Sequence, residues 1–444
     1  MSPKMPRSLP DLLHHQGATF RRRALFFAGG AVVGLLAVAM ALLADQAQAI
    51  FAQVAGRWHW APIVVTPAGF ALAAWLARRF FDGTQGSGIP QVIAARELDD
   101  FRAKSRLVSL RLGIAKIALL MLGLLCGASS GREGPTVQVG AAAMHFLGRV
   151  EPHRQPGLLL AGSAAGIAAA FNAPLAGIIF GIEEMSRSFE QRSSLLVLAT
   201  VIAAGLTSQA ILGDYTYFGV ASGSLPLNWQ WIAVLVSGVV CGLLGGIFSR
   251  VLLLFADGLP GRAMAALQSR PALFAGICGL LVAVCGLLAD GTVFGTGYGQ
   301  TKLILAGQAV PWAFGPLKLL ATALSSISGI PGGIFSPSLA VGAGIGYDLA
   351  PLMPGIPIGV LAILCMAAYL SGVVQAPLTS AVIVSEMTAD HSLIFPIMVV
   401  SLLASAVSKL ICREGIYHAL AHRLLDRLRP APAPEASTGA GAVG

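Results

Sequence analysis

The chain has 444 residues, of which 56% are hydrophobic and 11% charged, and its mean hydropathy is +0.77. Soluble globular domains carry roughly 25% charged residues, so this composition excludes an ordinary soluble protein and predicts an all-α polytopic membrane protein. The net charge of +9 lies largely in short polar runs beside apolar stretches, as expected for cytoplasmic loops, and predicts no nucleic-acid partner.

The apolar segments begin after a polar, basic tail, which we place at residues 1–23. Arg21–Arg23 precede an apolar run that ends at Ala44 and shows no clear signal-cleavage pattern. This run is roughly 20 residues long, enough to span a bilayer. The predicted apolar segments are residues 24–44, 60–77, 112–130, 157–182, 194–212, 229–249, 271–289, 303–330, 334–350, 355–384 and 393–412.

Several of these segments are too short, or too broken by glycine and proline, to cross a bilayer directly. Such interruptions indicate discontinuous helices that end inside the membrane around a polar site. Basic residues cluster at Arg21–Arg23, between Arg78 and Arg111, and at Arg423–Arg429. The positive-inside rule therefore places both termini in the cytoplasm. Residues 426–444 are predicted to be a disordered tail, because Pro430–Gly444 is rich in proline, alanine and glycine.

Cysteine and histidine usage predicts neither a metal site nor a cofactor. The histidines show no ligand spacing, and the cysteines form no CxxC pair. Nearly all of the cysteines lie in apolar runs, where we interpret them as small core residues. They are Cys126, Cys241, Cys278, Cys285, Cys365 and Cys412.

The chain also repeats itself. Residues of one type recur 202 positions later, among them Lys116 and Lys318, Gly131 and Gly333, Pro135 and Pro337, Gly140 and Gly342, Ala141 and Ala343, and Leu147 and Leu349. Ala173-Pro174-Leu175 matches Ala376-Pro377-Leu378, and Gly86-Ser-Gly88 matches Gly295-Thr-Gly297 more weakly. We predict two membrane half-repeats, 24–215 and 229–425, joined by a connector at 216–228, with the site at their interface.

Three glycine-rich turns followed by proline mark candidate helix N-termini, where unpaired N–H groups can bind an anion. They are Gly86–Pro90, Gly131–Pro135 and Gly332–Pro337. The alternative is that they are ordinary re-entrant turns. The repeat is asymmetric here, because Glu133 corresponds to Phe335 and Arg132 to Ile334. A carboxylate in apolar sequence is costly, so Glu133 is the first functional candidate.

The remaining charges inside apolar sequence are few, and two pairs of them are related by the repeat. Glu183 corresponds to Glu386, and we assign that pair a structural role; Lys116 and Lys318 are expected to be structural or electrostatic. Glu184 corresponds to Met387 and is the second functional candidate. The alternative is that Glu183 and Glu184 are both solvated at a helix end.

Two glycine patterns have structural interpretations. Gly127-Ala-Ser129-Ser-Gly131 matches the GxSxG pattern of hydrolases, but no His/Asp partners can be placed beside it. The four-residue spacings Gly123, Gly127, Gly131 and Gly238, Gly242, Gly246 favour close helix packing.

The motifs together resemble those of the CLC chloride channel and transporter family, in order, from about residue 24 to 425. They are GSGIPQ (86–91), GREGPTVQVG (131–140), AAAFNAPLAGIIFGIEE (168–184), PGGIFSPSLAVG (331–342) and QAPLTSAVIVSEMT (375–388). The resemblance implies a homodimer in a lipid bilayer. Each subunit would hold one anion pathway between two inverted-topology half-repeats of tilted, partly discontinuous helices.

Residue by residue, the resemblance implies that Ser87, Ile334, Phe335 and Tyr417 bind chloride. Glu133 would be the external gate and proton acceptor, and Glu184 the internal proton-transfer residue. Gln91 departs from the glutamate of many members, and no nucleotide-binding regulatory pair follows the membrane region.

We therefore expect a non-enzymatic chloride/proton antiporter of a bacterial inner membrane. A passive, voltage- or pH-gated chloride channel of the same family is the alternative, and Glu184 alone speaks against it. An intramembrane protease using Ser129 would need a buried basic partner. A purely structural scaffold would leave Glu133 unexplained.

Overall fold

The computed structural model describes residues 9–150, 154–186, 194–213, 217–219, 223–258, 261–390 and 392–428. These residues form helices and no β-strand. The predicted disordered end of the chain, from residue 429 onward, lies outside the described residues.

The first half contributes nine α-helices among the described residues. They are α1 (Leu9–Arg57), α2 (Ala61–Phe80), α3 (Ile89–Glu97), α4 (Phe101–Ser105), α5 (Leu110–Leu125), α6 (Glu133–Leu147), α7 (Gln155–Phe171), α8 (Pro174–Phe180) and α9 (Ser194–Leu212). A 3₁₀ turn, η1 (Gly148–Val150), follows α6, and a π-helical turn, η3 (Gly181–Ser186), continues α8.

The second half of the described chain begins with the 3₁₀ turn η4 (Trp229–Trp231), has a further one at η5 (Ala350–Leu352), and contains ten α-helices. They are α10 (Ile232–Asp257), α11 (Arg262–Gln268), α12 (Pro271–Leu288), α13 (Tyr298–Leu305), α14 (Phe314–Ile327), α15 (Phe335–Leu349), α16 (Ile358–Val374), α17 (Pro377–Thr388), α18 (Ile394–Ile411) and α19 (Ile416–Leu428).

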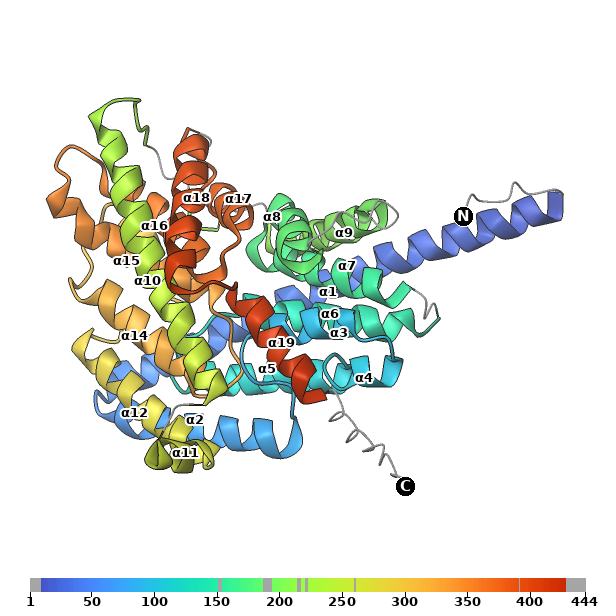
Figure 1. The fold of residues 1–444 in the computed structure, drawn as a ribbon, viewed down its shortest axis with the longest axis horizontal. Helices are drawn as coiled ribbons and strands as arrows, with labels where there is room; N and C mark the ends of the chain where they lie inside the picture. The colour runs from blue at the N-terminus through green and yellow to red at the C-terminus, as the bar shows by residue number, and fades with distance from the viewer. Residues whose placement is uncertain are drawn as a thin grey trace, which may run out of the picture.

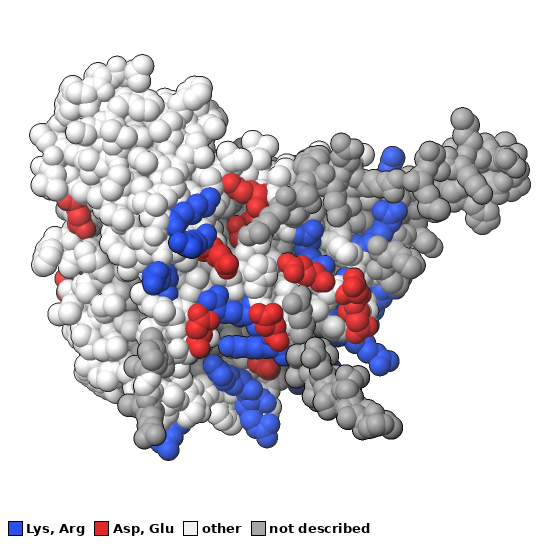
Figure 2. All heavy atoms as spheres, in the orientation of Figure 1, with Lys and Arg blue, Asp and Glu red and all other residues white. Residues whose placement is uncertain are grey.

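The helices confirm a polytopic membrane architecture with broken helices. Seven stretches of described residues are long and apolar enough to cross a membrane. The predicted segments 157–182 and 355–384 are each divided in two, at Asn172 and Gln375, which both adopt left-handed backbone conformations (φ 53° and 59°). Charged side chains gather around α3, α4 and α19 on the face shown in Figure 2.

Some predicted boundaries were wrong. Helix α1 begins at Leu9, so the tail predicted at 1–23 is helical over its described part. Helix α6 has no counterpart among the predicted apolar segments, although its first turn was identified by the glycine-proline motif. The segment predicted at 303–330 is two helices, α13 and α14. Helices α1 and α6 thus include polar residues that the apolar-segment prediction left out.

The two halves interlock (Figure 1). Helix α2 packs against α12, α8 against α17, and the C-terminal α19 lies across α3 from the first half. At the centre, Gly131 and Gly333 exchange backbone hydrogen bonds, each N–H donating to the other's carbonyl at 2.8 Å. Because these glycines are repeat equivalents, their reciprocal antiparallel pairing is the contact that a two-fold relation between the halves produces.

Lys116 and Lys318 are completely buried and make equivalent hydrogen bonds in the two halves. Each ammonium group donates to two carbonyl oxygens of the glycine-rich turn in its own half. These carbonyl groups lie outside any helix and therefore need a hydrogen-bond donor from elsewhere. The acceptors are Thr84 and Gly86 (2.8 and 2.6 Å) for Lys116, and Val293 and Gly295 (2.8 and 2.7 Å) for Lys318. The turns at Gly86–Gly88 and Gly295–Gly297, whose sequences match only weakly, therefore occupy equivalent positions in the two halves.

Glu183 and Glu386 confirm the structural role assigned to them. Each carboxylate caps the N-terminus of the short helix in the opposite half, Glu183 on α17 and Glu386 on α8. The donors are the N–H groups of Leu378 and Thr379 (3.1 and 2.6 Å) and of Leu175 and Ala176 (3.1 and 2.6 Å). A carboxylate at a helix N-terminus pairs orphan N–H groups and complements the helix dipole.

One glycine series packs as predicted and the other does not. Gly238, Gly242 and Gly246 of α10 lie against α18, where an added Cβ would meet atoms of residues 403–411. In the first series, α5 ends at Leu125. Gly127 and Gly131 therefore lie in a turn, and helix packing was the wrong interpretation for them.

Candidate functional site

The three glycine-proline motifs meet at the contact between the halves. Gly86 pairs with Pro331 beside the Gly131–Gly333 pair, and these contacts bring together the first turns of α3, α6 and α15. None of these three helices has a side-chain hydrogen bond at its N-cap. Their first N–H groups and positive dipole ends therefore face a shared, buried region, as an anion site requires.

Glu133 is the first residue of α6 and is completely buried. Its carboxylate accepts hydrogen bonds from the hydroxyl of Ser336 and from the Ser336 N–H, the latter at 3.4 Å. Gly131 leaves the room for this arrangement, because a Cβ there would overlap the carboxylate and Pro337. The carboxylate of one half thus sits on the N-terminus of α15 in the other half, where an anion would bind.

Arg132 does not neutralise its neighbour directly. Its Nη1 donates to the carbonyl of Ala41 and to Oδ1 of Asp45, both at 2.8 Å, so the guanidinium is held against α1. The donors at these three helix starts are therefore backbone N–H groups and hydroxyl groups, which could bind an ion without holding it too tightly for release.

Ser87 and Tyr417 contribute buried hydroxyl groups that have no hydrogen-bond partner among the described residues. The Tyr417 hydroxyl, in the first turn of α19, faces the Ser87 hydroxyl and lies near the carboxylates of Glu133 and Glu184. Gly134 allows Ser87 to approach α6, since a Cβ there would overlap the Ser87 hydroxyl. Two buried hydroxyl groups that lie side by side could both donate to one acceptor such as a halide.

Ile334 and Phe335 lie at the start of α15 and are buried, Ile334 as its N-cap. The Phe335 ring stacks on Tyr417, with centroids 6.0 Å apart and planes 17° apart. It also makes edge contacts with Phe171 and Phe180, both at 6.1 Å. These ring contacts hold the first turn of α15 in place and so set the direction of its backbone N–H groups.

Glu184 lies in η3 and is buried, with 4% of its surface exposed. It makes an ion-pair contact with His418 of α19, whose Nδ1 lies 3.3 Å from Glu184 Oε1. The sequence analysis did not select His418, which it placed among polar tails and helix ends. The signal that it missed is the position directly after Tyr417.

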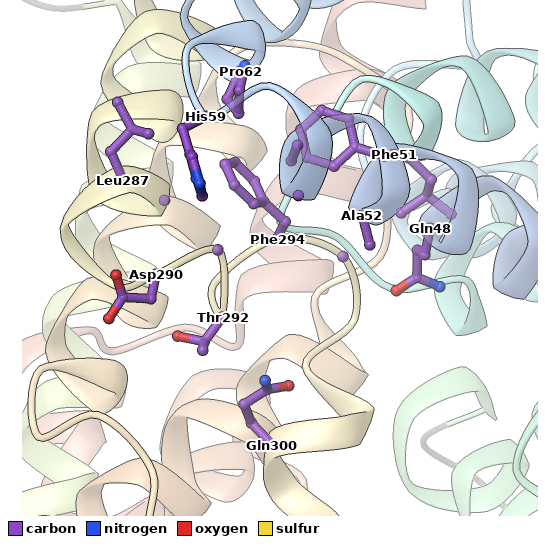
Figure 3. A pocket seen from close by; sticks show the side chains of 16 residues that line it. Gln48, Phe51, Ala52, His59, Pro62, Leu287, Asp290, Thr292, Phe294 and Gln300 are labelled. Atoms are coloured by element: carbon purple, nitrogen blue, oxygen red, sulfur yellow. The ribbon is translucent and has the colours of Figure 1, made fainter.

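The repeat counterpart of Ser87 is occupied by the protein itself. Thr296 donates to Oε1 of Gln48 from its N–H (2.8 Å) and its hydroxyl (3.2 Å). Gln48 also borders a cavity of about 420 Å³ that is lined by His59, Asp290, Thr292 and Gln300, among others (Figure 3). The two repeat positions therefore differ, because Gln48 accepts hydrogen bonds from Thr296 whereas no comparable side chain accepts from Ser87 among the described residues.

The hydrolase alternative gains no support from Ser129. Its hydroxyl bonds to that of Thr322 at 3.0 Å and its N–H to the Ser325 hydroxyl. In the part of the chain that the structure describes, no group of three or more His, Cys, Asp or Glu side chains is arranged for a metal ion.

Known proteins share this architecture. A family profile described as "Voltage gated chloride channel" matches residues 69–409. A protein named H(+)/Cl(-) exchange transporter ClcA from Yersinia pseudotuberculosis serotype IB (strain PB1/+) is 32% identical over 438 residues, covering 91% of this chain and 88% of that protein. A structure described as that of a slow cyanobacterial Cl-/H+ antiporter has a TM-score of 0.76 at 26% identity, covering 92% of this chain and 98% of its own. The fold is also similar to that of a CLC-type fluoride/proton antiporter, with a TM-score of 0.76 at 24% identity, covering 94% and 99% of the two chains.

Proposed function

This chain belongs to the voltage gated chloride channel family, and we propose that it exchanges chloride for protons across a bacterial inner membrane. The observation that carries the proposal is the buried Glu133 carboxylate, which lies on the N-terminus of α15 and accepts hydrogen bonds from Ser336. A protein carboxylate in that place competes with a transported anion for the same donors.

Chloride would bind beside this carboxylate, between the Ser87 and Tyr417 hydroxyls and the first N–H groups of α15 at Ile334 and Phe335. The two hydroxyls have no other partner among the described residues. All of these donors are neutral. A chloride ion would therefore be attracted by oriented dipoles and could still leave, as transport requires.

Glu133 would couple the two ions. When ionised, its carboxylate occupies the helix end and excludes chloride; when protonated, it loses its charge and its advantage as an anion. Proton binding and chloride binding are then linked through one place, and such linkage is reciprocal. Glu184 would exchange protons with the other side of the membrane, through the region of α19 and η3.

Antiport is favoured over a passive channel because the similar curated protein is named an exchange transporter and the similar structures are described as antiporters. We also propose a homodimer with one pathway per subunit. Both termini would be cytoplasmic, in agreement with the basic residues at Arg21–Arg23 and Arg423–Arg429.

The test is the purified protein in liposomes with a chloride gradient and no pH gradient. An exchanger moves protons uphill as chloride runs down, and its reversal potential lies away from the chloride equilibrium potential. Chloride flux with no proton movement, and reversal at the chloride potential, would instead identify a channel.

A further inference from the structure

His418 lies between Glu184 and a cavity that opens at the protein surface. The residue is 8% exposed, and its Nδ1 is 3.3 Å from Oε1 of Glu184, which is 4% exposed. The contact is an ion pair whose geometry is not that of a hydrogen bond, so the imidazole and the carboxylate must reorient slightly before a proton can pass between them.

The cavity has a volume of about 320 Å³ and reaches from Glu184 and His418 to exposed residues at its rim. Among the described residues, charged and titratable side chains from several adjoining elements line it. They are Glu183 of η3, Lys409 of α18, Arg413 and Glu414 of the following turn, and His422 one helical turn beyond His418. The wall is polar and carries both signs of charge, so water can fill the cavity up to the buried imidazole.

We propose that His418 relays protons between this cavity and Glu184. The proposal rests on the antiport function proposed above and adds a residue to its proton route. In one direction, the neutral ring gives its Nδ1 proton to the ionised Glu184 carboxylate while its Nε2 takes a proton from a hydronium ion in the cavity, which becomes water. The ring remains neutral and becomes the other tautomer, and proton exchange with the cavity water then restores the first tautomer. In the opposite direction every transfer reverses, so no oxidant or further reactant is needed.

A purely structural role would instead have His418 hold Glu184 in place by a hydrogen bond. The two roles separate in His418→Asn, because the asparagine amide can place an N–H donor near the position of Nδ1 but cannot carry a proton. His418→Ala removes both functions. His422→Asn is the matched control, because His422 lines the same cavity without an ion-pair contact to Glu184.

The experiment measures initial rates of chloride efflux and of uphill proton uptake for each variant in liposomes, over a range of pH. We expect His418→Asn and His418→Ala to lower proton uptake about tenfold while chloride efflux falls less, so that more chloride ions move per proton. His422→Asn should keep the wild-type ratio. In a Glu184→Gln background, His418→Asn should add no further loss, because residues that act in one route are not additive.

Three outcomes would overturn the relay: a His418→Asn variant with the wild-type ratio, equal proportional loss of both fluxes, or an additive effect in the Glu184→Gln background. If the wild-type protein itself moves no protons, the proposed antiport function fails. If it moves protons and His418→Asn does so equally well, the relay alone fails.

Discussion

Glu133 owes its position to residues on both sides of it. Gly131 and Gly134 leave room for the carboxylate and for Ser87, while Arg132 is turned away to Asp45 and Ala41. A buried carboxylate without a direct cationic partner is balanced here by the Ser336 hydroxyl and the dipole of α15. This arrangement can be abandoned when the carboxylate gains a proton.

Replacing Glu133 with glutamine should keep chloride transport and abolish its coupling to protons. The amide is neutral at every pH, so it cannot alternate between competing with chloride and releasing the site. The measurement is proton uptake driven by a chloride gradient in liposomes. Persistent uphill proton uptake by Glu133→Gln would remove this residue from the coupling mechanism.

Replacing Glu184 with glutamine should reduce proton transport strongly while chloride still moves. The neighbouring Glu183→Gln is a control of identical chemistry, since Glu183 caps α17 and is not expected to carry protons. Both variants are compared by their ratio of chloride to proton flux. Equal ratios in the two variants would return Glu184 to the alternative of a solvated helix end.

Replacing Tyr417 with phenylalanine should weaken chloride binding without disturbing the aromatic contact with Phe335. A hydrogen bond to a charged partner contributes about 1.5–3 kcal/mol, which corresponds to a loss of about tenfold to a hundredfold in affinity. Isothermal titration with chloride measures it. Tyr369→Phe is the matched control, because Tyr369 is also buried and unpartnered but lies on α16. Equal affinities for Tyr417→Phe and the wild-type protein would exclude the hydroxyl from the site.

Among the helices, α8 and α17 depend on each other's half of the chain. Both are short, begin with proline after an extended residue, and have no local side-chain cap. An isolated helix of this length is unstable in water, because nucleation is unfavourable. The carboxylates of Glu183 and Glu386 supply the missing caps from across the interface, so formation of these helices is tied to association of the halves.

Glu386→Gln should therefore lower stability without altering coupling. The loss of a charged cap costs about 1 kcal/mol at a partly exposed position. The midpoint of thermal unfolding in detergent should fall, and Glu183→Gln should give a similar decrease because the two caps are equivalent. A Glu386→Gln variant with an unchanged midpoint and an altered chloride-to-proton ratio would contradict the structural assignment.

Helix α19 is the element that joins the halves around the site. It packs against α3 of the first half. Arg423 on its outer end bonds bidentately to Asp257 at the end of α10. Its first turn carries Tyr417 toward the anion site and His418 toward Glu184. Adjacent residues on a helix point about 100° apart, so the two side chains of one turn can face the two different ion routes proposed above.

Over the whole molecule, the predictions that rested on local sequence pattern agree with the local structure. The glycine-proline motifs are helix starts, and Lys116 with Lys318 occupies equivalent positions in the two halves. Prediction failed where sequence pattern and packing diverge. Helix α6 is buried on all sides, so no polar face marked its extent, and Gly127 was assigned to a helix although its φ is 83°. His418 was missed because histidines were searched for metal-ligand spacing and not for a single contact beside Tyr417.

The sequence by itself determined the membrane class, the internal repeat, the helix breaks and the family, because each is a property of composition or of spacing along one chain. The tertiary structure alone decided that Gly131 pairs with Gly333, that Glu183 and Glu386 cap helices in opposite halves, that Gln48 fills the counterpart of the Ser87 site, and that His418 meets Glu184. These contacts join residues roughly 200 or more positions apart. They depend on how the two halves pack, and packing leaves no periodic trace in local sequence.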